Sequence, residues 1–247
     1  MASSYPELEF LFEDAALVAL VKPPGLPTAN AEAGEESVYT ILKRRWPPGA
    51  FVGVVSRLDA PVSGVVVLAK TSAAAAGLAA QFRERSVDKT YLAVVEGRFP
   101  APLERWIDWH DLISRQPGQS RSTVQRQADG AATVGAGEPD SGDETAPKPA
   151  HVRARVVRRA GEVSLVELCP STGRRHQLRV QLASRGCPIV GDRLYGARLP
   201  FPAGIALHAA VLAIAHPTTG APLRLESSPP RAWMQRYPSL VPRPTGP

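Results

Sequence analysis

The chain is poor in the residues that build metal sites, disulfide frameworks and membrane spans. It has 2 cysteines and 5 histidines in 247 residues. Cys169 and Cys187 form no CxxC pair, which predicts two reduced thiols and no metal centre. No apolar run approaches the roughly 20 residues of a membrane helix, and the N-terminus lacks the basic start and apolar stretch of a signal peptide. We therefore expect a soluble, cytoplasmic protein.

Aromatic residues are also scarce, at 6%, whereas hydrophobic residues reach 44%, enough for a substantial core. The formal net charge is +6. Between residues 151 and 198, ten arginines stand against three acids (Glu162, Glu167 and Asp192), a local net charge of +7. This segment indicates either an anionic partner such as nucleic acid or a solvated basic face, and charge alone does not separate the two.

Hairpin patterns outnumber βαβ patterns along the chain, so we expect an α+β fold with a mixed, largely antiparallel sheet flanked by helices. The expected elements are a hairpin over 8–21, a helix over 36–45, strands over 51–55 and 64–69, a helix over 72–86 capped by Ser72, a strand that ends at Gly97, a hairpin around Ala160 and Gly161, a helix that ends before Gly186, and a strand pair around 217–220.

One domain is expected over residues 1–230, interrupted by an insertion at 114–150. The only large apolar residues in that insertion are Val124 and Val134. Such a segment buries too little surface to offset its ordering entropy, so we expect it to be disordered. A proline-rich, peripheral tail is expected over 231–247.

The stretch "VVSRLDAPVSGVVVLAKT" (54–71) places two opposite charges, Arg57 and Asp59, between two apolar runs. Pro61 breaks the first strand and Gly64 permits the second, so residues 57–63 are expected to form a loop on a rigid scaffold. Arg57 would favour the ionised form of Asp59, which could then act as a base or nucleophile. Taken alone, the stretch is more often an ion pair that closes a turn.

Two other stretches add polar groups. "DKTYLAVVEG" places Lys89 and Tyr91 on one face of a strand, where they line a cleft or, more commonly, an edge. In "TGRRHQLRVQLA" the backbone before a helix start, together with Arg174 and Arg175, could receive a phosphate. Arg175 and Arg179 are four residues apart, so we expect them on one helical face, where they repel unless an anion lies nearby.

Six motifs in order resemble the RluA-type pseudouridine synthases, from about Phe10 to Pro222 with the insertion excepted. They are "LVALVKPPGLPT", "RLDAPVSGVVVLAKT", "KTYLAVVEG", "TGRRHQLRVQLASRGCPIVGDRLYG", "LHA" and "HPTTG". The resemblance implies an isomerase that converts uridine in RNA to pseudouridine, without a metal or organic cofactor. It further implies an active-site cleft and structured RNA, a ribosomal or transfer RNA stem-loop, as the substrate, and we expect a monomer.

The resemblance also implies roles for single residues. Asp59 matches the family's catalytic aspartate, and its action is either attack at C1′ or abstraction of a ribose proton. Tyr91 matches the tyrosine that stacks on uracil and could act as a base, and Arg179 matches the arginine that pairs with the catalytic carboxylate. Arg57 matches the residue that fills the space of a flipped base. The other expected RNA- or substrate-binding residues are Leu178, Lys89, Arg174, Arg175, His176 and Gln177.

The chain departs from the family's motifs at four positions. Ser56 stands where the family usually has His, Val62 and Arg175 each stand where it has Thr, and Gln181 stands where it has His. Two alternatives stay open, and the departure at Val62 in "APV" motivates the first of them. One is an RNA-binding or RNA-chaperone protein of the same fold that has lost catalysis. The other is a nucleosidase-type hydrolase, although that chemistry usually needs a second carboxylate near Asp59.

Overall fold

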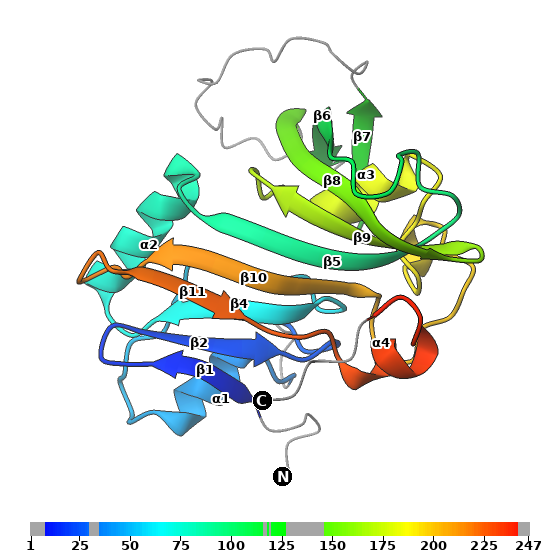
Figure 1. Cartoon of the computed structure of the whole chain (residues 1–247). Helices are drawn as coiled ribbons and strands as arrows, with labels where there is room; N and C mark the ends of the chain where they lie inside the picture. The colour runs from blue at the N-terminus through cyan, green and yellow to red at the C-terminus, as the bar shows by residue number, and fades with distance from the viewer. Residues whose placement is uncertain (1–7, 30–34, 116–117, 119, 127–145, 242–247) are drawn as a thin grey trace. The chain divides into compact units, whose positions relative to one another are not determined.

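A computed structural model describes residues 8–29, 35–115, 118, 120–126 and 146–241 (Figure 1). The chain that we expected to form one domain over 1–230 divides into two compact units, Met1–Tyr91 with Pro202–Pro247, and Leu92–Phe201. The described strand pairs confirm a mixed, largely antiparallel β structure with few helices, and the strand β5 covers Asp88–Glu96.

The first unit contains β1 (Glu9–Glu13), β2 (Leu17–Lys22), α1 (Val38–Arg45), β3 (Gly53–Val54), β4 (Ser63–Ala69), α2 (Ser72–Glu84), β10 (Leu207–Ala215), β11 (Pro222–Glu226) and α4 (Arg231–Arg236). The second contains β6 (Ile107–Arg115), β7 (Ser122–Arg126), β8 (Lys148–Ala160), β9 (Val163–Pro170), α3 (Gln177–Ala183) and the 3₁₀ turn η1 (Arg193–Tyr195). The strand β5 begins in the first unit and ends in the second.

The strands of the first unit follow the order β1-β2-β4-β10, with β3 on β4 and β11 on β10. Only the β4–β10 pair is parallel among the pairs described within this unit. Alternate residues of β4 enter two separate cores: Val65 and Val67 pack with Leu78 of α2, whereas Val66 and Leu68 pack with Leu42 of α1. Because helices cover both faces, β4 is buried throughout and reads as a continuous apolar run.

The two helices of this unit begin at side-chain caps. The Ser37 hydroxyl accepts from the Thr40 amide, and the Thr40 hydroxyl accepts from the Ser37 amide, so the two form a capping box. The helix α2 starts where we expected, but its cap is Thr71 rather than Ser72, since the Thr71 side chain accepts from the Ala74 amide.

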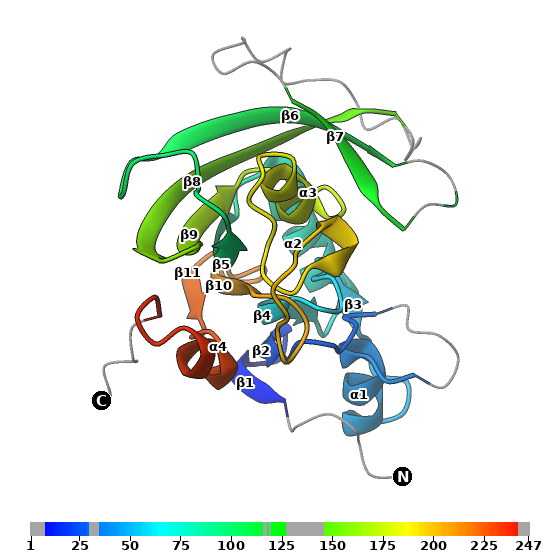
Figure 2. The ribbon, with the colours of Figure 1, turned by 90° about the vertical axis from the view of Figure 1, so that its right-hand side faces the viewer.

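In the second unit, β9-β8-β6-β7 form an antiparallel array in which β8 is amphipathic. Ala150, Val152 and Ala154 are buried, whereas Arg153 between them is exposed. Figure 2 shows the helix α3 beside β6 and β8. On the buried side of these strands, Val180 of α3 packs on Ile113 and Ala150. This packing places α3, with Leu178 and Arg179, on a rigid support.

The expected disorder of 114–150 is corrected at both ends of the segment. Residues 122–126 form β7, and β6 and β8 include residues 114–115 and 148–150. Pairing with β6 along one edge satisfies part of the β7 backbone, which orders this segment although its sequence is polar. Residues 116, 117, 119 and 127–145 lie outside the described part of the chain.

The tail from residue 231 is not peripheral. The helix α4 buries Trp233 completely, and Leu240 and Val241 are also buried. The Trp233 ring lies edge-on to His208 of β10, with 6.3 Å between ring centroids. A large apolar side chain therefore anchors this segment, and its proline content did not reveal that anchor. Residues 242–247 lie outside the described residues.

His208 joins the start of β4 to the segment that leads into α4. Its Nδ1 accepts from the Ser63 hydroxyl over 2.9 Å, and its Nε2 donates to the Ser227 carbonyl over 3.0 Å. This arrangement needs a neutral ring with its proton on Nε2. Burial lowers the pKa of His208 from 6.5 to about 4, against the opposing effect of the Ser227 carbonyl.

We therefore expect acid to destabilise the fold through His208. The unfolded chain binds this proton below pH 6.5 and the folded chain only below about pH 4, so the free energy of unfolding falls by about 3 kcal/mol as the pH drops through that window. Urea unfolding at pH 7 and pH 5 should show about 2 kcal/mol of this loss, because pH 5 lies about 1.5 units below the pKa of the unfolded chain. His208→Gln keeps polar contacts without the titration and should lose less stability between the two pH values; an equal loss would contradict the assignment.

Candidate active site

Asp59 lies in the loop between β3 and β4, as the sequence predicts, and backbone contacts hold that loop from several sides. The Val62 amide donates to the Asp59 carbonyl over 3.0 Å and closes a turn around Ala60 and Pro61. The Pro61 carbonyl accepts from the Ile205 amide over 3.1 Å. A loop fixed in this way presents the half-buried Asp59 carboxylate in one place.

The "KPPGLPT" loop clamps the same turn from the other side. The Gly25 amide donates to the Ala60 carbonyl over 2.8 Å. Thr28 Oγ1 accepts from the Leu58 amide and donates to the Leu58 carbonyl, both over 3.1 Å. The residues on either side of Asp59 thus share hydrogen bonds with one rigid, proline-rich segment.

Lys22, at the end of β2, is fully buried beneath this clamp. Its ammonium donates to the carbonyls of Pro23 (3.0 Å), Leu26 (2.7 Å) and Ala60 (3.0 Å). Burial lowers the pKa of Lys22 to about 7, and the negative charge of Asp59 acts in the opposite direction. The sequence placed Lys22 in a motif but did not show that its charge is buried near Asp59.

Tyr91, on β5, shares the electrostatic environment of Asp59. Burial raises the pKa of Tyr91 well above its usual value, and the charge of Asp59 raises it further. The phenol therefore stays protonated at neutral pH, which favours stacking and hydrogen-bond donation over the role of a base.

The other candidates in the first unit are two cations. Lys89 is half-buried, and burial together with the charge of Arg85 lowers its pKa to about 8. Arg57 is exposed on the Asp59 loop. An exposed guanidinium beside a fixed carboxylate can reach an RNA backbone or the space left by a displaced base.

In the second unit, Arg179 and Leu178 are buried in α3. Arg179 forms a bidentate ion pair with Asp192, from Nε to Oδ2 over 2.7 Å and from Nη2 to Oδ1 over 2.9 Å. The pattern of the sequence did not single out Asp192, although it lies in the "GDRLYG" motif.

The start of α3 differs from the expectation for "TGRRHQ". The helix begins at Gln177, so Arg175 precedes it and does not share a helical face with Arg179. The Arg174 amide donates to Oε1 of the buried Gln177 over 3.0 Å, so this amide is not open to a phosphate. His176 has a left-handed φ of 54°, and its Nδ1 lies 2.9 Å from the Tyr195 hydroxyl.

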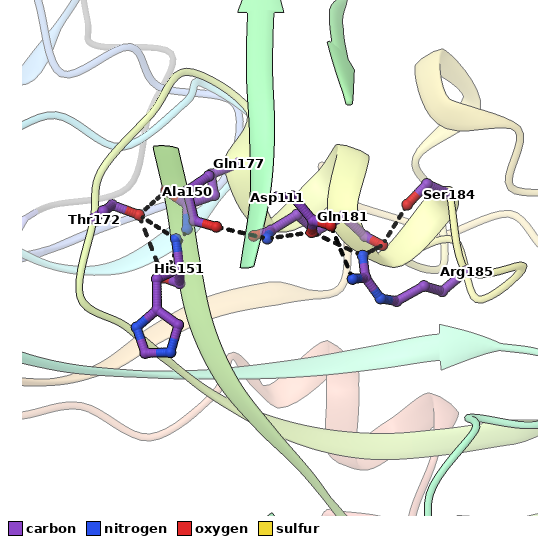
Figure 3. Close-up of polar contacts among 8 residues, drawn as sticks. All are labelled: Asp111, Ala150, His151, Thr172, Gln177, Gln181, Ser184 and Arg185. Atoms are coloured by element: carbon purple, nitrogen blue, oxygen red, sulfur yellow. Dashed lines mark hydrogen bonds and ion pairs between the residues drawn. The ribbon is translucent and has the colours of Figure 1, made fainter. Parts of the chain in front are cut away.

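A polar network attaches α3 to β6 and β8 at two places (Figure 3). At the first turn, Gln177 Nε2 donates to the His151 carbonyl over 3.0 Å, and Thr172 Oγ1 donates to Gln177 Oε1 over 2.8 Å. At the other end, Asp111 accepts from Gln181 Nε2 over 2.7 Å and from both terminal nitrogens of Arg185 over 2.9 and 3.0 Å. Gln181, which replaces the family's usual His, is thus an anchor of the helix.

Neither a metal centre nor a membrane helix is found in the described part of the chain. Among those residues, no group of three or more His, Cys, Asp or Glu side chains is placed to hold a metal ion. No helix there has both the length and the apolar character needed to span a bilayer.

Comparison with known proteins places this geometry in a family. Residues 16–184 match the sequence model of a family described as RNA pseudouridylate synthase. The dual-specificity RNA pseudouridine synthase RluA of Salmonella typhimurium is 36% identical over 220 residues, which cover 87% of this chain and 90% of that protein. The ribosomal large subunit pseudouridine synthase D of Zymomonas mobilis is 30% identical and covers 91% of this chain, with 70% of its own length matched.

A solved structure has the same fold over almost the whole chain. Human RNA pseudouridylate synthase domain containing 4 superposes with a TM-score of 0.71 at 26% identity, covering 95% of each chain. The similarity extends over both compact units, so the motifs and the architecture point to one family.

Proposed function

The chain belongs to the RNA pseudouridylate synthase family, and from this premise we propose that Asp59, Tyr91 and Arg179 carry its reaction. The protein is an isomerase that forms pseudouridine in RNA. The observation that carries the proposed site is the Asp59 loop, fixed by Lys22 and the residues after it, with its carboxylate charge acting on Tyr91.

The reaction exchanges one bond to the ribose for another. The bond between N1 of uracil and C1′ breaks, the base turns, and C5 bonds to C1′ while the C5 proton leaves and N1 gains a proton. We propose that Asp59 acts on the sugar, either by attack at C1′ or by removal of a ribose proton. A fixed carboxylate suits both steps, because each needs one oxygen held against one atom of the ribose.

A uridine within a stacked stem must first leave the stack, at a cost of a few kcal/mol. We propose that Arg57 fills the space that the base leaves, since its guanidinium is exposed on the same loop as Asp59. The neutral ring of Tyr91, which keeps its hydroxyl proton, would stack on the extruded uracil and contribute about 1–3 kcal/mol. The remaining proposed contacts to RNA or to the uridine are Leu178, Lys89, Arg174, Arg175, His176 and Gln177. Gln177 is buried in α3, which supports an indirect role for this residue.

The loop geometry does not favour the catalytically lapsed alternative. The turn around Ala60 is closed by the Val62 amide and the Asp59 carbonyl, which do not depend on a hydroxyl at position 62. Val62 is itself buried, so its methyl groups occupy the position of the family's Thr within the core. The departure at this position therefore leaves the mount of Asp59 in place.

We propose ribosomal or transfer RNA stem-loops as substrates, and a monomer that acts in the cytoplasm. The test is pseudouridine mapping of total RNA from cells with and without the gene. We expect at least one uridine in rRNA or tRNA to lose its modification when the gene is absent and to regain it on complementation with the wild-type gene, but not with a gene for Asp59→Asn. Unchanged maps in both RNA classes would contradict the proposed substrates.

A further inference from the structure

We propose that Asp192 is a positioning residue for catalysis, because it fixes the direction in which the Arg179 guanidinium presents its donors. The inference rests on the catalytic role proposed for Arg179. It goes beyond that role by naming a second carboxylate, in the second unit, on which the reaction depends.

The pair is built for orientation. Both Asp192 oxygens are used, one on Nε and one on Nη2 of Arg179, so the carboxylate and the guanidinium lie in a fork-to-fork arrangement. The two side chains are 6% and 1% exposed. Asp192 thus binds the edge of the guanidinium that carries Nε and Nη2. Because the group is planar, this contact also sets the direction in which Nη1 points.

The backbone of Asp192 is also fixed. Its amide donates to the Ile189 carbonyl over 2.9 Å, and its carbonyl accepts from the amides of Tyr195 (3.0 Å) and Ala197 (3.1 Å). Asp192 is the N-cap of η1, a position where an aspartate side chain usually caps the turn, yet it makes no such hydrogen bond. Its carboxylate serves Arg179 instead.

Tyr195, three residues after Asp192 in the chain, packs its ring against the face of the Arg179 guanidinium. The Arg179 guanidinium carbon lies 5.1 Å from the centre of the Tyr195 ring. The Tyr195 hydroxyl accepts from the Ser122 amide over 2.8 Å and lies 2.9 Å from His176 Nδ1. The guanidinium is therefore confined within its plane by Asp192 and across its plane by a ring that is itself anchored.

The charge balance sharpens the expected effect. The Arg179–Asp192 pair is neutral as a whole, so Arg179 offers directed N–H donors more than net positive charge. Asp192→Asn keeps the size and shape of the side chain but frees the guanidinium to rotate. It also removes one negative charge, so the net charge of the protein rises by one. Turnover should therefore fall while the affinity for RNA does not, because phosphate attraction grows with positive charge.

The second unit provides a matched control. Asp111 and Arg185 form another bidentate ion pair, and their side chains are 0% and 3% exposed. Arg185 follows Arg179 by six residues in the chain. The first turn of α3 has its own attachments through Gln177, so Asp111→Asn should destabilise the fold without turning Arg179. A purely structural role for Asp192 predicts the same behaviour for the two variants.

The experiment compares the wild type with Asp192→Asn, Asp111→Asn, Arg179→Met and the double variant Asp192→Asn/Arg179→Met, all at a temperature where circular dichroism shows each to be folded. The substrates are unmodified transcripts of large-subunit rRNA and tRNA with tritium at C5 of uridine, since C5 loses its hydrogen in the reaction. Single-turnover rates and RNA affinities are measured separately.

We expect Asp192→Asn to lower the single-turnover rate by about a hundredfold, the typical cost of misplacing a reacting group, with RNA affinity unchanged or higher. Asp111→Asn should stay within about threefold of the wild type, and adding Asp192→Asn to Arg179→Met should cost nothing further. Equal rates for Asp192→Asn and Asp111→Asn, with Arg179→Met impaired, would overturn this inference alone. A wild-type rate for Arg179→Met would instead overturn the proposed role of Arg179 on which it rests.

Discussion

Asp59→Asn is expected to lower the rate of pseudouridine formation by a factor on the order of a thousand or more, as removal of a reacting side chain does in other enzymes. Asparagine keeps the volume of the side chain and the turn closed by the Val62 amide, which uses only backbone atoms. Affinity for RNA should stay within about tenfold, about 1.4 kcal/mol. Single-turnover kinetics and equilibrium binding on the same transcript measure the two effects separately.

The control for this variant is Asp88→Asn, which removes an exposed carboxylate at the start of β5, the strand that carries Tyr91. It changes the net charge by the same amount and should keep the wild-type rate. Substantial activity in Asp59→Asn would show that another group acts on the ribose. A loss of affinity as large as the loss of rate would show that Asp59 binds RNA rather than transforms it.

The parts of the fold that depend on local sequence could be predicted. The hairpin of β1 and β2, the helices α1 and α2 and the strand β5 lie close to their expected bounds, because hydrophobic period, turn residues and capping residues are neighbours in the chain. The Asp59 loop was found for the same reason. Its proline and glycine interrupt two apolar runs, and the interruption is visible without any contact from elsewhere.

The buried contacts that hold the Asp59 loop and the helix α3 in place could not be predicted, because their partners come from distant parts of the sequence. Lys22 reaches Ala60, 38 residues away, and Arg185 reaches Asp111, 74 residues away. Nothing local distinguishes these buried charges from exposed ones. One local signal could have marked Lys22 as buried. It directly follows five apolar residues in "LVALVK", so it continues a strand that is expected to be buried, although a fully buried lysine is rare.

Composition alone gave a wrong prediction of order in two segments, the insertion at 114–150 and the tail from residue 231. The segment 114–150 is polar, yet β7 gains order from its backbone pairing with β6. The tail is proline-rich, yet Trp233 anchors it within the first unit beside His208. A single aromatic residue can order a segment whose average composition is polar. The free energy gained by burying one tryptophan side chain offsets the cost of ordering several of its neighbours.

Asp111→Ala is expected to lower the free energy of unfolding by about 3–5 kcal/mol, the usual cost of removing one partner of a buried ion pair. The Arg185 guanidinium would stay buried against Trp109, at 4.0 Å from the ring centre, without its anion. Gln181 Nε2 would lose its 2.7 Å bond to Asp111. Urea unfolding of both proteins, with the slopes compared, measures the loss.

The double variant Asp111→Leu/Arg185→Met identifies the origin of that loss. If the unpaired charge dominates, replacing both partners by apolar side chains should recover more than half of the lost stability, since buried pairs exchange for apolar pairs at little cost. If the double variant is as unstable as Asp111→Ala, the loss lies instead in Gln181, whose side chain would keep only its 3.5 Å contact to the Ala150 carbonyl. The attachment of α3 would then depend on the amide network rather than on the ion pair.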